Sequence, residues 1–144
     1  MILLCAIVTV SRRKMSFAIK KDPDALQAAA AKRTKAVKGR RAFTKGEQAA
    51  ADGDWKRAVA YYHVALAKQR EHYGEDHVAT SDTLNSLGVA MMNLGEPFGA
   101  LTALEEALRI RQRALGAGAE EAAETTNNMW AVLRSSREDG GYET

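Results

Sequence analysis

The fold of this 144-residue chain is decided by residues 83–116, whose sequence is TLNSLGVAMMNLGEPFGALTALEEALRIRQRALG. Within residues 78–94, apolar residues recur three and four positions apart, as one face of a helix requires. Pro97 follows a glycine turn and suits the first turn of a new helix. The same spacing continues through residues 97–114. It predicts that one apolar face of this helix is formed by Phe98, Leu101, Leu104, Ala107 and Leu108. The stretch therefore predicts two helices joined by a short turn.

The same pattern occurs earlier in the chain at a constant offset of 42 residues. Residues 53–87 align without gaps on residues 95–129, so that Gly53 matches Gly95 and Gly74 matches Gly116. A period of this size is typical of stacked helix pairs. The repeat predicts three more helices, over residues 40–51, 54–70 and 120–137.

Small residues stand at matching positions of the repeats. Gly46 and Gly88 lie within the predicted first helices, and Ala58 and Ala100 lie within the second. A glycine inside a helix costs about 1 kcal/mol relative to alanine. We therefore expect these positions to be sites where two antiparallel helices approach closely.

Charge is divided unequally along the chain. Residues 1–46 carry twelve Lys or Arg and two Asp, whereas residues 47–144 carry nine Lys or Arg and sixteen Asp or Glu. Asp22, Pro23 and Asp24 predict the start of a basic helix over residues 22–41, of which 22–39 precede the repeats. Its bases are compatible with a solvated face or with binding to nucleic acid or acidic membrane, without base stacking because no aromatic residue lies among them. The candidate anion-binding residues are Lys32, Arg33, Lys35, Lys38, Arg40 and Arg41.

Residues 1–21 form an apolar and then basic N-terminal tail. The apolar run covers only residues 1–10, which as a helix reaches roughly 15 Å, about half of a bilayer core. The tail is compatible with disorder or weak membrane contact, with an organelle-targeting segment, or with a true start at Met15. We expect a cytoplasmic protein, with organelle targeting as the alternative.

No pattern of catalytic chemistry is present in the sequence. It contains neither a nucleophile–base spacing nor a glycine-rich phosphate loop, so we expect a non-catalytic protein without a cofactor. The single cysteine, Cys5, excludes an internal disulfide. His72, Glu75, Asp76 and His77 cluster in one loop, but no second cluster completes a metal site, and none is expected.

Residues 83–116 resemble a tetratricopeptide repeat, specifically the long-loop type of the kinesin light chains. The resemblance covers residues 40–138 and implies a short right-handed α-solenoid. The loop GEDHVAT over residues 74–80 is similar to that family's G-x-x-H-P-x-V-A linker, although no proline follows His77. The positions that fit the repeat pattern are Gly46, Gly53, Ala58, Tyr62 and Ala65, followed by Leu87, Gly88, Gly95, Ala100, Leu104 and Ala107.

By this resemblance the first helix of each repeat lines a concave groove that holds a peptide or helix of a protein partner. Asn85 and Asn127 recur at one repeat position, and an amide can both donate to and accept from a peptide backbone. Solvated asparagines on an exposed helix face are the alternative. The candidate partner-binding residues are Phe43, Asn85, Val89, Met92, Asn127 and Arg134.

The C-terminal end of the array departs from the pattern. The third repeat lacks a second helix, and Trp130 stands where a small residue is expected. We expect about two and a half repeats, whereas solenoids need roughly three for stability, so self-association is one expected outcome. Trp130 is expected either to close the open end or to anchor an interface. Residues 139–144 are expected to be a disordered tail.

Overall fold

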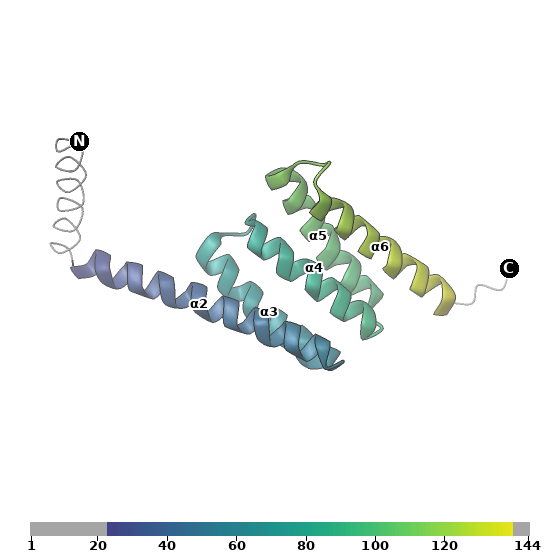
Figure 1. Cartoon of the computed structure of the whole chain (residues 1–144), viewed down its shortest axis with the longest axis horizontal. Helices are drawn as coiled ribbons and strands as arrows, with labels where there is room; N and C mark the ends of the chain where they lie inside the picture. Colours follow the sequence, from purple (N-terminus) through teal and green to yellow (C-terminus); the bar gives the residue numbers. More distant parts are fainter. Residues whose placement is uncertain (1–22, 140–144) are drawn as a thin grey trace, which may run out of the picture. The chain divides into compact units, whose positions relative to one another are not determined.

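The computed structural model describes residues 23–139, and in this part of the chain all regular secondary structure is α-helix (Figure 1). The predicted all-α class is confirmed. Its helices pack as antiparallel adjacent pairs, as expected for stacked repeats. They are α2 (Pro23–Ala51), α3 (Trp55–Tyr73), α4 (Val78–Asn93), α5 (Pro97–Leu115) and α6 (Glu120–Asp139). None of these helices is both long enough and apolar enough to cross a membrane.

The first helix is longer than the sequence predicts. Two adjoining helices were expected over residues 22–41 and 40–51, and the structure joins them into α2. The chain divides between Thr34 and Lys35 into two units, with α2 contributing residues to both. Gly39 does not end the helix, because it is buried against Lys68 and Gln69 of α3. The N-cap expected at Asp22, the tail over residues 1–21 and residues 140–144 of the tail expected over 139–144 lie outside the described residues.

The repeat of 42 residues appears directly in the backbone of the turns. Gly53 and Gly95 have φ values of 75° and 78°, and Gly74 and Gly116 have φ values of 93° and 94°. Other residues rarely adopt this left-handed region, which ends a helix and turns the chain. Each pair therefore sets the same turn in successive repeats.

The core of the second unit forms around α4, which packs against α3, α5 and α6 (Figure 1). The predicted close approaches are present. A Cβ added to Gly46 would stand 2.6 Å from Tyr62 Cε1, and one added to Gly88 would stand 2.5 Å from Leu104 Cγ. Ala58 and Ala100 are fully buried, and Trp55 is half-buried against the main core.

The apolar face predicted for α5 is partly wrong. Phe98, assigned to that face, is 85% exposed. Phe98 is two positions before Ala100, about half a turn around α5, so it lies on the side away from the buried stripe. The buried stripe begins two residues later and consists of Ala100, Ala103, Leu104, Ala107, Ile110 and Arg111.

Candidate partner-binding surfaces

One stripe of α4 remains accessible, while its other faces are covered by neighbouring helices. Asp82, Ser86 and Val89 are half-buried and Asn93 is exposed, at the spacing of one helix face. Every residue between Thr80 and Ala90 outside this stripe is buried. In α6 the residues at the matching repeat positions also remain at least partly exposed, and we name the two sets together the first-helix stripe. Its α6 members are Glu124, Asn128, Ala131 and Ser135.

A buried guanidinium lies beneath one end of the first-helix stripe. Arg111 of α5 is 4% exposed, and its Nη2 donates to Asp82 Oδ1 at 3.0 Å. Its Nη1 donates to Thr125 Oγ1 and to the Glu121 carbonyl, both at 2.7 Å, and to Glu124 Oε2 at 3.2 Å. Arg111 therefore joins α4, α5 and α6, and the two carboxylates leave one negative charge in excess.

The role of Arg111 is not evident from the residue spacing within α5. Its partners Asp82 and Thr125 lie 29 and 14 residues away, so helical spacing within α5 cannot reveal them. A signal was available in the repeat: Gln69 occupies the matching position and is also buried. A polar residue on an apolar stripe at two equivalent positions indicates a buried polar contact.

Three of the candidate partner-binding residues are apolar and half-buried. Val89 is on the first-helix stripe of α4. Met92, also on α4, packs against the core cluster of Ala100, Leu104 and Val132. Phe43 of α2 contacts the ring of Tyr62, with the centroids 5.9 Å apart.

The two asparagines expected to share one role have different environments. Asn85 is 7% exposed, and its amide lies between α4 and α6. Its Oδ1 accepts from Asn128 Nδ2 at 3.1 Å, and its Nδ2 donates to Glu124 Oε1 at 3.4 Å. Asn127 is exposed, and its side chain makes no hydrogen bond to any residue in 23–139. The burial of Asn85 arises because α6 covers the position in α4, whereas no described helix covers Asn127.

Arg134 lies with an exposed aromatic residue on α6. Trp130, Leu133, Arg134 and Arg137 line a shallow pocket on this helix. Trp130 is 64% exposed and Leu133 is 40% exposed. The structure thus places Asn127 and Arg134 on a different surface from Val89, and does not unite the six candidates in one site.

The candidate anion-binding residues also fall into two environments. Lys35 forms an ion pair with Glu71 of α3, which lowers the pKa of that carboxyl. Lys32, Arg33 and Lys38 are exposed. Arg40 and Arg41 are exposed and pair with no carboxylate among residues 23–139.

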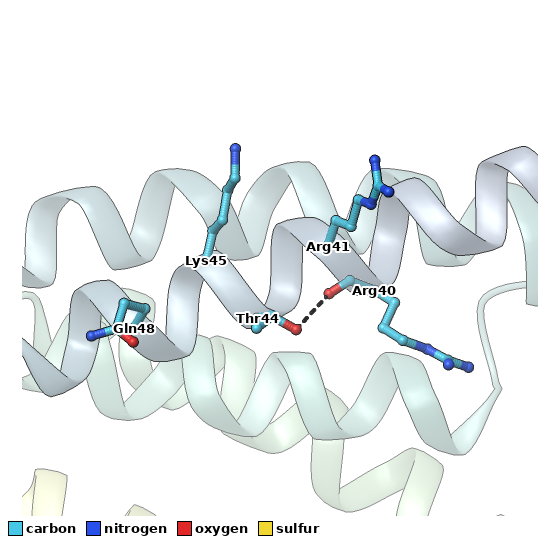
Figure 2. Close-up of a pocket in the computed structure, with 5 residues that line it drawn as sticks. All are labelled: Arg40, Arg41, Thr44, Lys45 and Gln48. Carbon is cyan, nitrogen blue, oxygen red and sulfur yellow. Dashed lines mark hydrogen bonds between the residues drawn. The ribbon is translucent and has the colours of Figure 1, made fainter.

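Arg40 and Arg41 line a pocket on α2 with Thr44, Lys45 and Gln48 (Figure 2). In Figure 2 Arg41 and Lys45 extend from the helix in the same direction, and Arg40 projects differently. The Lys45 ammonium lies 5.7 Å from the centre of the Tyr61 ring.

The loop that carries His72, Glu75, Asp76 and His77 is held by ion pairs and a helix cap. Glu75 lies 2.7 Å from Arg70 Nε, and Asp76 lies 2.8 Å from Arg109 Nη2. His77 caps α4 by accepting from the Ala79 N–H at 3.1 Å, and its ring stacks on Tyr73. Nowhere in residues 23–139 do three His, Cys, Asp or Glu side chains gather as a metal site would require.

Comparison with known proteins gives one family. The sequence profile described as Tetratricopeptide repeat matches residues 49–79 and 80–121, which together make up just over half of the chain. A search of curated proteins found no significant match. The matched segments coincide with the helices and glycine turns that repeat every 42 residues. The chain therefore belongs to the tetratricopeptide repeat family.

Proposed function

We propose that this protein is a non-catalytic interaction module, or adaptor, that binds a peptide or helix of a protein partner along the first-helix stripe. Repeats of this family are generally protein–protein interaction modules. The observation that carries the proposal is the accessibility of Ser86 and Val89 on a helix that its neighbours otherwise cover, together with that of their counterparts on α6. This accessible stripe recurs at the same repeat positions in α4 and α6.

The chemistry of the first-helix stripe suits an extended or helical segment. Ser86, Val89, Ala131 and Ser135 have short side chains, so a partner backbone can approach the two helices closely. At one end, the Asp82 and Glu124 side chains are 49% and 57% exposed and share a single guanidinium. The excess negative charge favours a partner with a Lys or Arg at this end.

We further propose that the repeats are of the kinesin light chain type, about two and a half in number, and act in the cytoplasm. The linker over residues 74–80 supports the first part, because Gly74 and His77 have the spacing of that type's G-x-x-H-P-x-V-A linker, although Val78 stands in place of the proline. Repeats of one fold bind many different partners, so the partner of this chain is to be identified by experiment.

The test is capture of partners from source lysate by the full chain and by two matched variants. Val89→Arg puts a long cation in the middle of the first-helix stripe. Val64→Arg makes the same change on α3, where the valine is 52% exposed. A partner retained by the wild type and by Val64→Arg but lost by Val89→Arg supports the proposal. Equal retention by both variants would overturn it.

The asparagines are not suitable for this test. Asn85→Ala removes hydrogen bonds between α4 and α6, so it changes stability as well as any binding. Glu124→Gln is a second variant, because it keeps the side chain's size and removes one exposed negative charge. Since Glu124 also accepts from Asn85 and Arg111, its urea denaturation is measured alongside its binding. The variant should weaken binding of a partner with a basic residue and leave a neutral partner unaffected.

The pocket around Arg40, Arg41 and Lys45 supports a second candidate function, in which α2 binds an anionic polymer or surface (Figure 2). Binding of this kind releases counterions, so log K falls with log salt by about 0.9 per phosphate contacted on B-DNA. Arg40→Gln with Arg41→Gln should weaken binding to duplex DNA or to anionic vesicles and flatten the salt dependence. The matched control, Lys56→Gln with Arg113→Gln, removes two exposed charges elsewhere. Equal binding by both double variants would exclude this candidate.

A further inference from the structure

One face of α6 is exposed at positions that are buried in α4. Trp130 occupies the repeat position of Gly88, Asn127 that of Asn85, and Ala123 that of Ser81. The three α4 residues are buried, whereas their α6 counterparts are exposed. We name this surface the α6 end face, and it comprises Glu120, Ala123, Asn127, Trp130, Arg134 and Arg137.

The opposite end of the repeats differs in chemistry. In α4, Thr83, Leu87 and Ala90 are buried. The matching residues of α2 are Arg41, Lys45 and Gln48, which are exposed. Charged and polar residues on a terminal helix are the usual cap of a repeat array. On the α6 end face the central position instead carries a tryptophan, which is enriched at the energetic centres of protein interfaces.

The charges on the α6 end face differ between its two ends. Glu120 lies in the first turn of α6, and Arg134 and Arg137 lie near the other end, where Glu138 and Asp139 complete the helix. Two such helices side by side in a parallel arrangement would face Glu120 with Glu120 and Arg134 with Arg134. In an antiparallel arrangement Glu120 of each helix faces Arg134 of the other.

We propose that the α6 end face docks against the α6 end face of a second copy of this chain, antiparallel and about a two-fold axis at Asn127. Arg134 and Glu120 are each seven residues from Asn127, so they face each other twice across the axis. The Trp130 ring then meets Ala123 of the second copy, as Leu104 meets Gly88 within the chain. The two Asn127 amides meet at the axis, where each can donate to the other.

The α6 end face shares no residue with the first-helix stripe, so the two proposals can be tested by different variants. Val89→Arg should leave the dimer intact. A variant of the α6 end face such as Trp130→Glu should be monomeric and should still capture the partner that Val89→Arg loses.

The first experiment is sedimentation equilibrium of the full chain at concentrations from roughly 1 to roughly 100 µM. The wild type should dimerise, and Trp130→Glu should raise the dimer Kd by at least about tenfold. The matched control is Phe98→Glu, since Phe98 is an aromatic residue that is 85% exposed on α5. It should dimerise as the wild type does. Circular dichroism establishes that each variant is folded, as expected for substitution of exposed side chains.

The second experiment tests the antiparallel register. Arg134→Glu faces Glu120 with a like charge and should weaken the dimer. The combined variant Glu120→Arg with Arg134→Glu reverses both charges and should restore it. In a Cys5→Ser background, Asn127→Cys should form a disulfide-linked dimer under mild oxidation, whereas Thr102→Cys on α5 should not.

Three outcomes overturn the proposal. The wild type could remain monomeric over the whole concentration range, which would leave a different protein as the occupant of the α6 end face. The dimer could tolerate Trp130→Glu as well as Phe98→Glu, which would place the interface elsewhere. The combined charge reversal could fail to recover what Arg134→Glu loses, which would exclude this register.

Discussion

Gly88 of α4 lies so close to Leu104 of α5 that a Cβ on the glycine would stand 2.5 Å from Leu104 Cγ. The same relationship exists 42 residues earlier, where a Cβ on Gly46 would stand 2.6 Å from the Tyr62 ring. Leu104 and Tyr62 are both almost completely buried. In each repeat a large side chain of the second helix thus fills the space that a glycine leaves in the first.

Gly88→Ala should destabilise the protein, although alanine favours a helix by about 1 kcal/mol over glycine. The added methyl group cannot fit without moving Leu104, so we expect a net loss of about 1–3 kcal/mol in the free energy of unfolding. Urea denaturation measures it. Gly99→Ala is the control, because its Cβ would meet only the flexible end of Met91, at 3.0 Å. A Gly88→Ala variant at least as stable as Gly99→Ala would contradict this account.

Ala100→Leu should also overpack the contact between α4 and α5. Ala100 is fully buried in a cluster with Leu104 and Val132, and its carbonyl lies near Gly88. The larger side chain should cost about 1–3 kcal/mol. Ala114→Leu makes the same change at an exposed position of α5 and should be close to neutral. Equal melting temperatures for the two variants would refute the packing described for Ala100.

Arg111→Gln tests the junction of α4, α5 and α6. Position 111 matches position 69 of the preceding repeat, so the variant carries the same residue, glutamine, at both positions. Asp82, Glu124 and Thr125 would lose their shared donor, and we expect a loss of about 2–3 kcal/mol, since both carboxylates keep partial access to water. Arg113→Gln removes an arginine whose side chain is 67% exposed and should change stability by less than about 0.5 kcal/mol. Similar unfolding curves for both variants would mean that Arg111 contributes little.

Tyr62 should make the protein sensitive to alkaline pH. Burial, and next the hydrogen bond to Glu47 at 2.5 Å, raise the pKa of the Tyr62 hydroxyl in the folded state. An unfolded tyrosine loses its proton near pH 10, so the stability that Tyr62 contributes is complete below about pH 10 and declines as pH rises further.

Denaturation between neutral pH and roughly pH 11 measures this dependence. Tyr62→Phe should weaken the alkaline decline, whereas Tyr73→Phe, at a side chain that is 38% exposed, should leave it in place. Parallel pH profiles for the wild type and Tyr62→Phe would exclude Tyr62 as the cause.

Much of the fold follows from the sequence because its determinants are local. The helix ends depend on residues such as Asp54, whose carboxylate accepts from the Arg57 N–H at 3.1 Å, and on the four glycines at positive φ. The offset of 42 residues then carries every local feature of one repeat to the next. These signals determine which residues form helices, how the helices are paired, and where close approach is needed.

The candidate sites follow from the sequence only in part, because accessibility depends on the neighbours of a helix. Helical spacing gives Asn85 and Asn127 the same position, but α6 covers Asn85 and no described helix covers Asn127. Phe98 was expected on the packed face of α5, yet it lies about half a helical turn from the stripe that begins at Ala100 and is exposed.

The helical repeat, its glycine turns and the small residues at its contacts all follow from the order of the amino acids. Only the tertiary structure shows that Arg111 joins three helices and that Asn85 of α4 forms hydrogen bonds with α6. It also shows that Trp130 stands on an open face. The physical reason is distance along the chain. Caps, turns and amphipathic faces act over a few residues, whereas burial and ion pairing of these side chains depend on helices that meet only after folding.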